Sequence, residues 1–526
     1  MGPLQGKCRA GFGRRLPPAL RSPRHGTDCV LRRSRHLRLP LLQRRHGACR
    51  HASKGQSRRL RLVAGFDLQA ILDAYGGVPT AQDVAHLNPR FHDLLRLTGL
   101  DRRFVDGTGP WLVDESGRRY LDAIGGYACL AVGRNHPVVR DALQQVLEAG
   151  PPSLIQFEVP PLAVALADRL KNFIDRRDDR VFFVNSGTEA VEAAMKICRA
   201  ATDRPGFAHW SNAFHGLTMG ALSLNGSEWL RRGFRPLISD CHEVPFGDLD
   251  ALRITLQDRR IAAFFYEPIQ GKGVVEHEPG VLREVAEICR QTGTLLVADE
   301  VQTGLGRTGA TLASRHDGVE PDLICLSKVL SAGMVPVGAV VGRAEIFDRV
   351  FESVERSVVH SSTFRENPLA MTAGLATLQV LEREDLVERS SAMGARIVEG
   401  LRTESGWAPG IRSIRGRGLM IGVELDPDAM SFGIPGFGTR TSTLVAQAVA
   451  LRMLDAHGIL VQSTAKSSAV IKIVPPLVIR ESEADLIASS LLETIAELRR
   501  GRGAGIRGLI DMLSRAPDVV LREAFR

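Results

Sequence analysis

The sequence predicts an α/β fold built on a mostly parallel β-sheet. Two stretches carry this prediction: residues 295–298 and 323–326 are short apolar runs bounded by Gly, Pro or charged residues. Such runs are typical of strands that are buried on both faces of a parallel sheet. Asp299 follows the first run and Lys328 closely follows the second. Ligands bind at the carboxyl ends of such strands, so both are candidate site residues, although either alone is as readily an ion pair.

Three motifs around these residues resemble those of a known family. They are Asp299-Glu300-Val301-Gln302-Thr303-Gly304, Gly306-Arg307-Thr308-Gly309 and Ser327-Lys328. Together they resemble the class III aminotransferases, pyridoxal phosphate (PLP) enzymes that include the ornithine, acetylornithine and 4-aminobutyrate enzymes. The resemblance extends from about residue 100 to about residue 495. It implies PLP-dependent transferase fold type I, in which a large domain with a mostly parallel seven-stranded sheet flanked by helices is joined to a smaller α+β domain.

Composition limits the possible classes of protein. A chain of 526 residues with 44% hydrophobic residues is long enough for two or three domains and a large core. No run approaches 18 uninterrupted apolar residues, so we expect no membrane span. The eight cysteines have no paired spacing such as Cys-x-x-Cys, so we expect neither a metal site nor a disulfide framework. A reducing, cytoplasmic location fits this pattern best.

The net charge of +9 comes from one end of the chain. Residues 1–61 carry 15 Arg and 2 Lys against one acid, Asp28, so the rest of the chain has a net charge of −7. Basic charge confined to a tail does not make a nucleic-acid-binding face, and we expect no nucleic-acid partner. We expect a disordered basic leader over residues 1–61. It is either a mitochondrial presequence, which would direct the protein to the matrix, or translated upstream sequence.

The remaining chain divides into four predicted segments. Residues 62–135 form an N-terminal segment that contributes to the small domain, with helical patterns near 68–75 and 91–95 and a hairpin over 109–122. Residues 136–355 form the large PLP-binding domain, which begins with a helix to about residue 149. Residues 356–498 form the C-terminal small domain, with helices over 369–382 and up to 401 and strands over 418–425 and 470–474. Residues 499–526 form a tail with a short surface helix over 509–513.

A phosphate site is predicted where a strand over 181–184 turns into a helix over 190–200. The turn contains Ser186, Gly187 and Thr188. Unpaired N–H groups and the positive end of the helix dipole favour a phosphate there. Taken alone, the motif is more often an ordinary N-capped helix. The resemblance to class III aminotransferases favours the phosphate of PLP.

The resemblance assigns contacts to the cofactor ring. Phe214 would stack on one face of the pyridine and Val301 on the other, and the neighbouring His215 could hydrogen-bond nearby without a chemical role of its own. Asp299 would keep the ring nitrogen protonated, which makes the ring an electron sink. Gln302 would bond the 3-oxygen of the cofactor.

Lys328 would form the Schiff base with PLP and then move a proton between the substrate carbon and the cofactor. Glu300 must point away from Asp299, because successive strand residues face opposite sides. The implied activity is a ping-pong transfer of an amino group between an amine or amino acid and an oxo acid or aldehyde. A PLP-dependent aminomutase or epimerase would use the same Asp299 and Lys328 without needing a second oxo substrate, and a non-enzymatic binding protein would lack one of them.

Residues 304–309 also fit the dinucleotide fingerprint G-x-G-x-x-G. The second strand and helix of a βαβ unit are not evident, so we do not expect nicotinamide binding. Residues 363–368 resemble the family segment Thr-Phe/Tyr-Gly-Gly-Asn-Pro. The resemblance implies a homodimer in which Thr363 reaches the cofactor phosphate of the partner subunit. Arg365 and Glu366 replace the two glycines, which leaves the conformation of this loop open.

Two further departures concern the substrate. Lys272 replaces the Glu of a Gln-Gly-Glu-Gly stretch, and Lys472 replaces the Arg before Pro-Pro-Leu. Two lysines cannot form the Glu–Arg switch of the ornithine and 4-aminobutyrate enzymes, and a lysine lacks the two-pronged grip of arginine. We therefore expect a larger or differently charged amine or aldehyde, such as an intermediate in natural-product or lipid modification. Candidate substrate residues are Lys272, Lys472 and Tyr127, which lies at the active-site mouth.

Overall fold

The computed structural model describes residues 66–76, 86–88, 90–426, 428–429, 442–464, 469–500 and 514–515. The predicted leader and the predicted helix over 509–513 lie outside these residues. Within the described ranges, no helix is both long and apolar enough to cross a membrane.

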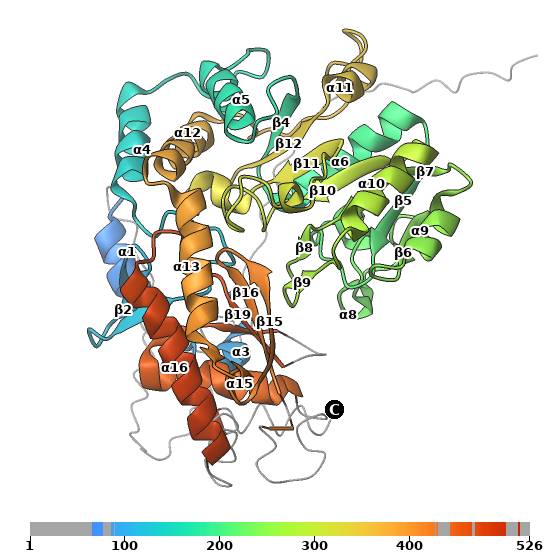
Figure 1. The fold of residues 1–526 in the computed structure, drawn as a ribbon. Coiled ribbons are helices and arrows are strands. Elements are labelled where there is room, and N and C mark those ends of the chain that lie inside the picture. Colours follow the sequence, from blue (N-terminus) through green and yellow to red (C-terminus); the bar gives the residue numbers. More distant parts are fainter. Residues whose placement is uncertain are drawn as a thin grey trace, which may run out of the picture. The chain divides into compact units, whose positions relative to one another are not determined.

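A seven-stranded sheet forms the centre of the larger part of the fold (Figure 1). In spatial order, its strands are β4 (Arg180–Val184), β12 (Gly338–Gly342), β11 (Leu323–Leu326), β10 (Leu295–Asp299), β7 (Ile261–Tyr266), β5 (Gly206–Trp210) and β6 (Cys241–Val244). Only β12 runs antiparallel to its neighbours. The predicted mostly parallel, seven-stranded sheet is confirmed, and the two apolar runs are the neighbouring parallel strands β10 and β11.

Both faces of this sheet are covered by helices, which explains why its strands are apolar without alternation. The covering helices are α6 (Gly187–Thr202) and α11 (Ala344–Val350) on one face, and α9 (Leu249–Leu256) and α10 (Val281–Thr292) on the other. Consecutive residues of β7 pack into different cores: Phe265 joins the core under α6, and Phe264 joins the core under α9 and α10. Both side chains are fully buried.

The strands β8 (Ile269–Gln270) and β9 (Val275–Glu276) form one two-stranded sheet, and β13 (Arg402–Thr403) and β14 (Gly406–Trp407) form another. Two larger sheets have four strands each. One contains β1 (Phe104–Thr108), β2 (Trp111–Asp114), β3 (Arg119–Asp122) and β17 (Ile459–Leu460). The other contains β15 (Ile411–Arg417), β16 (Met420–Leu425), β19 (Val470–Ile473) and β18 (Gln462–Ser463). The strand β17 pairs with β3, so segments from the two ends of the described chain share one sheet.

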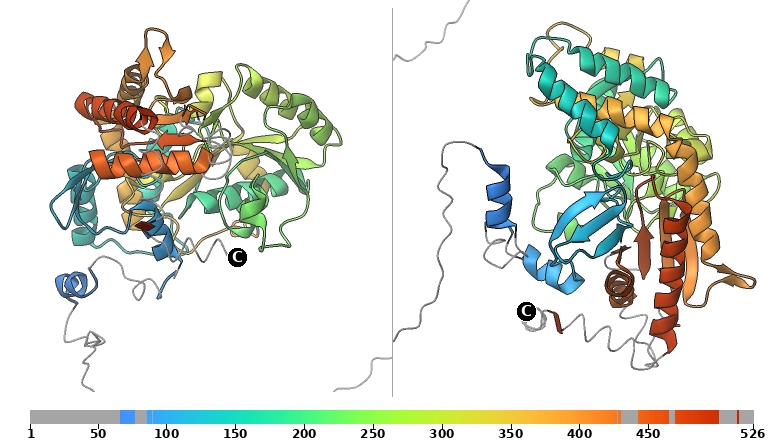
Figure 2. Two further views of the ribbon diagram at one scale, coloured as in Figure 1. Left: turned by 90° about the horizontal axis from the view of Figure 1, so that it is seen from below. Right: turned by 90° about the vertical axis from the view of Figure 1, so that its left-hand side faces the viewer.

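Within the described residues, the remaining main helices include all the other helices predicted from the sequence and three more. They are α1 (Leu68–Tyr75), α3 (Phe91–Thr98), α4 (Pro137–Ala149), α5 (Pro161–Phe173), α12 (Pro368–Arg383), α13 (Leu386–Gly400), α15 (Ser442–Arg452) and α16 (Glu481–Arg500), of which α5, α15 and α16 had not been predicted. Figure 2 shows the long helices α13 and α16 lying side by side against the C-terminal sheet.

Two local predictions can be compared with the structure in detail. The predicted hairpin turn is present: Gly117 has a φ of +84°, and the Asp114 carboxylate accepts hydrogen bonds from the N–H groups of Ser116 and Arg118. The helix expected from residue 190 instead begins at Gly187, because the Ser186 side chain caps it by accepting a hydrogen bond from Glu189 N–H at 3.3 Å.

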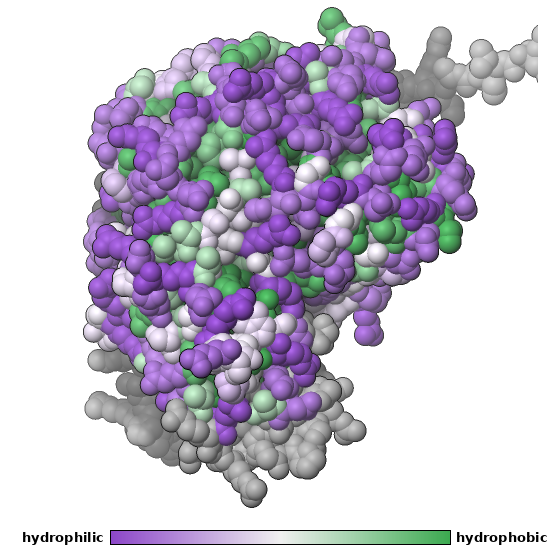
Figure 3. All heavy atoms as spheres, viewed as in Figure 1, coloured by the Kyte–Doolittle hydropathy of each residue, from purple (hydrophilic) through white to green (hydrophobic). Residues whose placement is uncertain are grey.

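The surface seen in Figure 3 is mainly hydrophilic, with hydrophobic residues in small groups between charged ones. The large apolar side chains lie inside: Trp210, Tyr120 and Tyr266 are among the largest that are fully buried. The fold is therefore held by continuous apolar cores on both faces of the central sheet.

Candidate active site

Four predicted site segments and one residue that was not predicted, Glu267, follow strands that end at one edge of the seven-stranded sheet. The segments concerned are 186–188 after β4, 214–215 after β5, Glu267 after β7, Asp299 at the end of β10 and Lys328 after β11. Because these strands are parallel to one another, their carboxyl ends meet at the same edge, which is where open α/β sheets bind ligands.

Asp299 and His215 form a buried pair at this edge. Oδ2 of Asp299 lies 2.8 Å from Nδ1 of His215, and Oδ1 accepts a hydrogen bond from Val301 N–H at 3.1 Å. Burial alone would lower the pKa of His215, but the hydrogen bond and charge of Asp299, with the charge of Glu267, raise it above its ordinary value. From the sequence, His215 is expected only to form a nearby hydrogen bond, because its partner is 84 residues away in the chain.

Glu300 points to the other side of the strand, as predicted. Its carboxylate accepts hydrogen bonds from Thr303 Oγ1 at 2.6 Å, Ala313 N–H at 3.0 Å and Ser314 N–H at 2.8 Å. These contacts anchor the turns after β10 and do not reach the sheet edge. Of the two acids, only Asp299 is placed for chemistry.

The N-terminus of α6 offers an anion site. The backbone N–H groups of Gly187 and Thr188 lie in the first turn, where no intrahelical acceptor exists, and the helix dipole adds positive potential. A Cβ atom at Gly187 would lie 2.7 Å from Cγ1 of Val301, so only glycine lets the helix approach the end of β10 this closely. The hydroxyl of Thr188 lies 2.8 Å from that of Thr218.

Phe214 and Val301 are the apolar side chains near this edge that stay accessible. Phe214 is 38% exposed, and Val301 is half-buried. Two hydrogen bonds from its backbone hold the loop that carries Phe214. Phe214 N–H donates to Oε1 of Glu267 at 2.9 Å, and His215 N–H donates to Oδ1 of Asn225 at 2.7 Å. The sequence analysis missed Glu267, although it follows an apolar run as Asp299 does.

Lys328 begins η2 (Lys328–Ser331) directly after the β11 strand and Ser327. The preceding Ser327 is tied down, since its hydroxyl donates to the carbonyl of Val337 at 2.7 Å. The ammonium of Lys328 makes no hydrogen bond with any residue in the described ranges, and it is half-buried. Its charge reaches Cys129 and Lys472, whose pKa values it lowers in part. A half-buried lysine whose amine has no hydrogen-bond partner among the described residues is suited to carry an aldehyde cofactor.

Lys472 lies on β19 and is buried, with 5% of its surface exposed. Its Nζ donates to the carbonyl of Gly271 at 2.7 Å and to Oε1 of Gln302 at 3.1 Å. Burial, followed by the charge of Lys328, lowers the pKa of Lys472 to about 7. Lys272, the other departure from the family pattern, is half-buried between β8 (Ile269–Gln270) and β9 (Val275–Glu276).

The segment that carries Tyr127 has an unusual backbone. Gly125, Gly126, Tyr127 and Ala128 all have left-handed φ values, between 56° and 77°. Side chains disfavour this region, and such residues cluster at functional sites. A Cβ atom at Gly125 would lie 2.5 Å from the carbonyl oxygen of Val474, so the segment lies close to the chain after β19. The Tyr127 side chain is exposed.

The loop with Thr363 keeps a glycine-like conformation without glycine. Glu366 has a φ of +62°, its carboxylate pairs with Arg365 at 2.7 Å, and the Arg365 guanidinium lies 5.2 Å from the ring centre of Phe182. Thr363 itself is exposed, and the neighbouring Ser362 hydroxyl accepts a hydrogen bond from Nδ2 of Asn185 at 2.7 Å. The loop therefore lies next to the turn that precedes α6.

Arg307 belongs to the glycine-rich turn over 304–309 and is fully buried. Its Nη1 donates to the carbonyls of Leu419 at 3.1 Å and Pro475 at 2.5 Å, while Nε and Nη2 have no partner within the described chain. Burial lowers the pKa of Arg307 to about 9. The glycines open a series of turns, whereas the glycines of a dinucleotide fingerprint open a helix.

The residues at the sheet edge fit PLP. The amine of Lys328 is suited to react with its aldehyde, and the Asp299 carboxylate, which is hydrogen-bonded to His215, is suited to bind its ring nitrogen. The N-terminus of α6, where Gly187 packs closely against Val301, is suited to bind its phosphate. Searching the described residues finds no group of three or more His, Cys, Asp or Glu side chains able to hold a metal ion.

A family profile and a curated protein match this sequence. The profile of the family described as Aminotransferase class-III matches residues 100–495. Aminotransferase PigE from Serratia sp. (strain ATCC 39006) is 38% identical over 447 residues, which cover 78% of this chain and 52% of PigE. The chain thus spans about half the length of this curated relative.

Solved structures show the same fold. The ornithine aminotransferase of Toxoplasma gondii superposes with a TM-score of 0.70 at 31% identity, covering 84% of this chain and 100% of that one. A PLP-bound amine transaminase from an uncultivated Pseudomonas species gives a TM-score of 0.67 at 29% identity, covering 75% of this chain and 94% of that one. The chain therefore belongs to the class III aminotransferase family, whose enzymes depend on PLP.

Proposed function

We propose that this protein transfers an amino group between an amine or amino acid and an oxo acid or aldehyde in a ping-pong reaction, with PLP carried on Lys328. The observation that supports this most directly is the free amine of Lys328 at the same sheet edge as the Asp299–His215 pair. When bound, PLP supplies an electron sink for the substrate carbon.

Each cofactor contact has a physical task in this proposal. Asp299, held by His215, keeps a proton at the ring nitrogen. The N–H groups of Gly187 and Thr188 bind the phosphate, aided by the Ser186 cap. Phe214 and Val301 would flank the ring and exclude water from its faces.

Lys328 acts twice in the proposed reaction. It holds the cofactor before the substrate arrives, and its amine then moves a proton at the substrate carbon.

The substrate is proposed to differ from the ornithine type. Lys472 donates to Gly271 and Gln302, and no carboxylate–guanidinium switch can form between Lys272 and Lys472. One similar structure is called an ornithine aminotransferase and another an amine transaminase, so the family fold accommodates both kinds of donor. If steady-state assays gave acetylornithine or 4-aminobutyrate with 2-oxoglutarate as the best pair, the proposal would be wrong.

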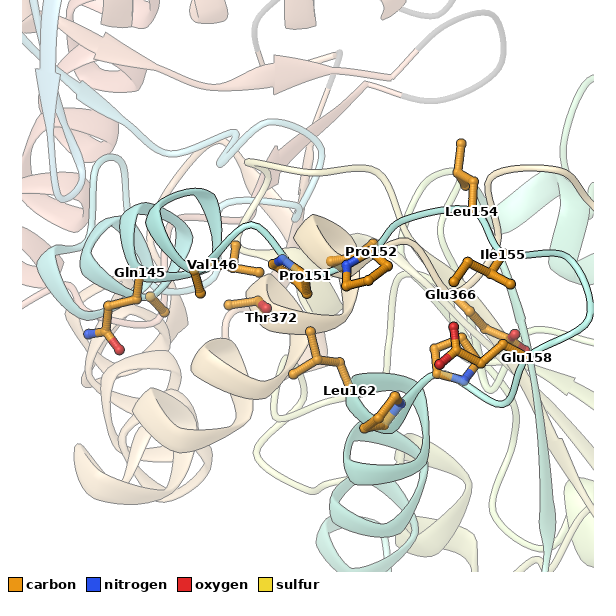
Figure 4. A pocket seen from close by; sticks show the side chains of 15 residues that line it. Gln145, Val146, Pro151, Pro152, Leu154, Ile155, Glu158, Leu162, Glu366 and Thr372 are labelled. Atoms are coloured by element: carbon orange, nitrogen blue, oxygen red, sulfur yellow. The ribbon is translucent and has the colours of Figure 1, made fainter.

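A homodimer is part of the proposed function, with Thr363 contacting the partner's cofactor phosphate. A largely apolar cavity of about 520 Å³ lies between α4, the segment over 151–160, α5 and α12, and Glu366 of the Thr363 loop lines it (Figure 4). Nearby Phe157 is 97% exposed. Exposed apolar surface next to the Thr363 loop supports the proposal that a second copy of the chain buries this surface in a dimer. A monomer in light scattering at working concentration would contradict this.

We also propose a cytoplasmic location. The five cysteines in the described residues are free, as expected in a reducing compartment. Cell fractionation followed by immunodetection of the full chain would test this.

The decisive experiment traps the cofactor. Purified protein is incubated with PLP, reduced with borohydride and digested, and the peptides are analysed by mass spectrometry. We expect the adduct at Lys328, and the chain has few competing lysines because Arg provides most of its positive charge. Absence of the adduct would refute the proposal. Detection of a co-product oxo acid separates an aminotransferase from an aminomutase or epimerase, which needs no second oxo substrate.

A further inference from the structure

The side-chain amide of Gln302 is held at both ends. Its Oε1 accepts a hydrogen bond from Nζ of Lys472 at 3.1 Å, and its Nε2 donates to the carbonyl of Tyr127 at 3.4 Å. An ammonium has three donors and no acceptor, so Lys472 in this form selects the oxygen end of the amide. Without it, only the longer hydrogen bond from Nε2 to the Tyr127 carbonyl would oppose a half-turn of the amide that exchanges oxygen and nitrogen.

Lys472 is itself fixed by a chain of buried contacts. Its Nζ donates to the carbonyl of Gly271 at 2.7 Å, and Gly271 N–H donates to Oε2 of Glu267 at 2.7 Å. A Cβ atom at Gly271 would lie 2.3 Å from Oε1 of Gln302, so glycine is needed for this close approach. Glu267 also binds Phe214 N–H, which links the chain to the loop of the stacking aromatic.

We propose that Lys472 is a positioning residue that orients the amide of Gln302, so that its NH₂ group faces the 3-oxygen of PLP. The inference rests on the proposed function, in which Gln302 contacts that oxygen. Lys472 then replaces the carboxylate-binding Arg of the ornithine-type enzymes without taking over its task. Its donors are used within the protein, and its side chain is buried. A substrate carboxylate is consequently not held by Lys472.

The charge of Lys472 depends on its surroundings. The charged groups that act on it are Lys328 and Arg307, which disfavour the ammonium, and Glu267, which favours it. At high pH a neutral amine gains a lone pair and loses its selectivity for the oxygen end of the amide. The orienting effect is therefore strongest below about pH 7.

A double-mutant cycle on cofactor affinity tests the role. PLP dissociation constants are measured for the full chain freed of cofactor, at pH 6.5, for wild type, Lys472→Met, Gln302→Met and the double variant. Each single change should weaken binding about tenfold, and the double variant should be no weaker than Gln302→Met, since Lys472 acts through Gln302. Lys171→Met on α5, whose Nζ bonds the carbonyl of Arg177, serves as the lysine control and should bind PLP as wild type does.

The proposal fails if the two changes add to about a hundredfold loss, or if Lys472→Met leaves PLP binding unchanged. The ratio of the PLP dissociation constants of Lys472→Met and wild type should also be smaller at pH 9.5.

A third readout compares the KM values of 5-aminopentanoate and pentylamine, and Lys472→Met should change both alike. A selective tenfold rise for 5-aminopentanoate would make Lys472 a substrate anchor instead. If borohydride fails to label Lys328 in wild type, the proposed function fails; if labelling succeeds but the cycle is additive, only this inference fails.

Discussion

Replacing Lys472 by Met should stabilise the cofactor-free protein while weakening its cofactor binding. Lys472 is buried, and its pKa falls to about 7 from an ordinary value of 10.5. Above both values, neither the folded nor the unfolded state carries the proton. Between them, only the unfolded state binds it, so the free energy of unfolding rises with pH in this window. Below pH 7 both states are charged, and the buried ammonium destabilises the fold in full.

The size of the stability change follows from the pH range between the folded-state and unfolded-state pKa values of Lys472. Each pH unit contributes about 1.4 kcal/mol, so the wild-type protein should gain about 3 kcal/mol relative to Lys472→Met between pH 6.5 and pH 9.5. Loss of the two donated hydrogen bonds costs the variant about 1–3 kcal/mol at every pH. The advantage of Lys472→Met should therefore be greatest at pH 6.5 and small or reversed at pH 9.5.

Urea unfolding of both cofactor-free proteins at the two pH values measures this difference. Gln302→Met provides a matched control, because it removes an acceptor but keeps the ammonium, and it should retain the wild-type pH dependence. A stability difference between wild type and Lys472→Met that stays constant within about 0.5 kcal/mol over this range would refute the reasoning.

Three further outcomes are expected. Asp299→Asn should lower kcat/KM more than a hundredfold, because the ring nitrogen loses its carboxylate. The control Asp322→Asn, at the other end of the neighbouring strand, should lower mainly the melting temperature. Equal losses of kcat/KM in the two variants would contradict this prediction. Gly187→Ala should weaken PLP binding about tenfold in equilibrium titration, since its Cβ would lie 2.7 Å from Val301 Cγ1, and unchanged affinity would argue against the phosphate site. A heterodimer of one Thr363→Ala and one Lys328→Ala subunit should keep about half of wild-type activity, because one of its two sites is intact if each site uses its own Lys328 and the partner subunit's Thr363. Activity well below that of a wild-type site would contradict this arrangement.

The strands and the two central site residues were predictable because their signals are local. An apolar run without alternation marks a strand covered on both faces, as the opposite packing of Phe264 and Phe265 shows. Asp299 and Lys328 lie directly after such runs, where parallel strands must end together. The N-cap at Ser186 is also local, although it places the start of α6 three residues earlier than expected.

The contacts that refine the site were not predictable, because they join residues far apart in the chain. His215 and Asp299 are 84 residues apart, Lys472 and Gln302 are 170 apart, and Lys472 and Gly271 are 201 apart. The residue types at these positions fit many partners, and only the tertiary fold selects one. The same is true of Glu366, whose left-handed backbone is supported by Arg365 and not by a glycine.

The buried guanidinium of Arg307 limits how the protein can open. Its hydrogen bonds join the turn over 304–309 to Leu419, which lies between β15 and β16, and to Pro475, which follows β19. Moving the C-terminal sheet away would remove both carbonyl acceptors from a cation whose Nε and Nη2 have no partner in the described chain, and a hydrogen bond to a charged group contributes about 1.5–3 kcal/mol. Substrate entry is therefore expected to depend on movement of exposed loops, with the C-terminal sheet serving as a fixed wall of the active site and not as a hinged lid.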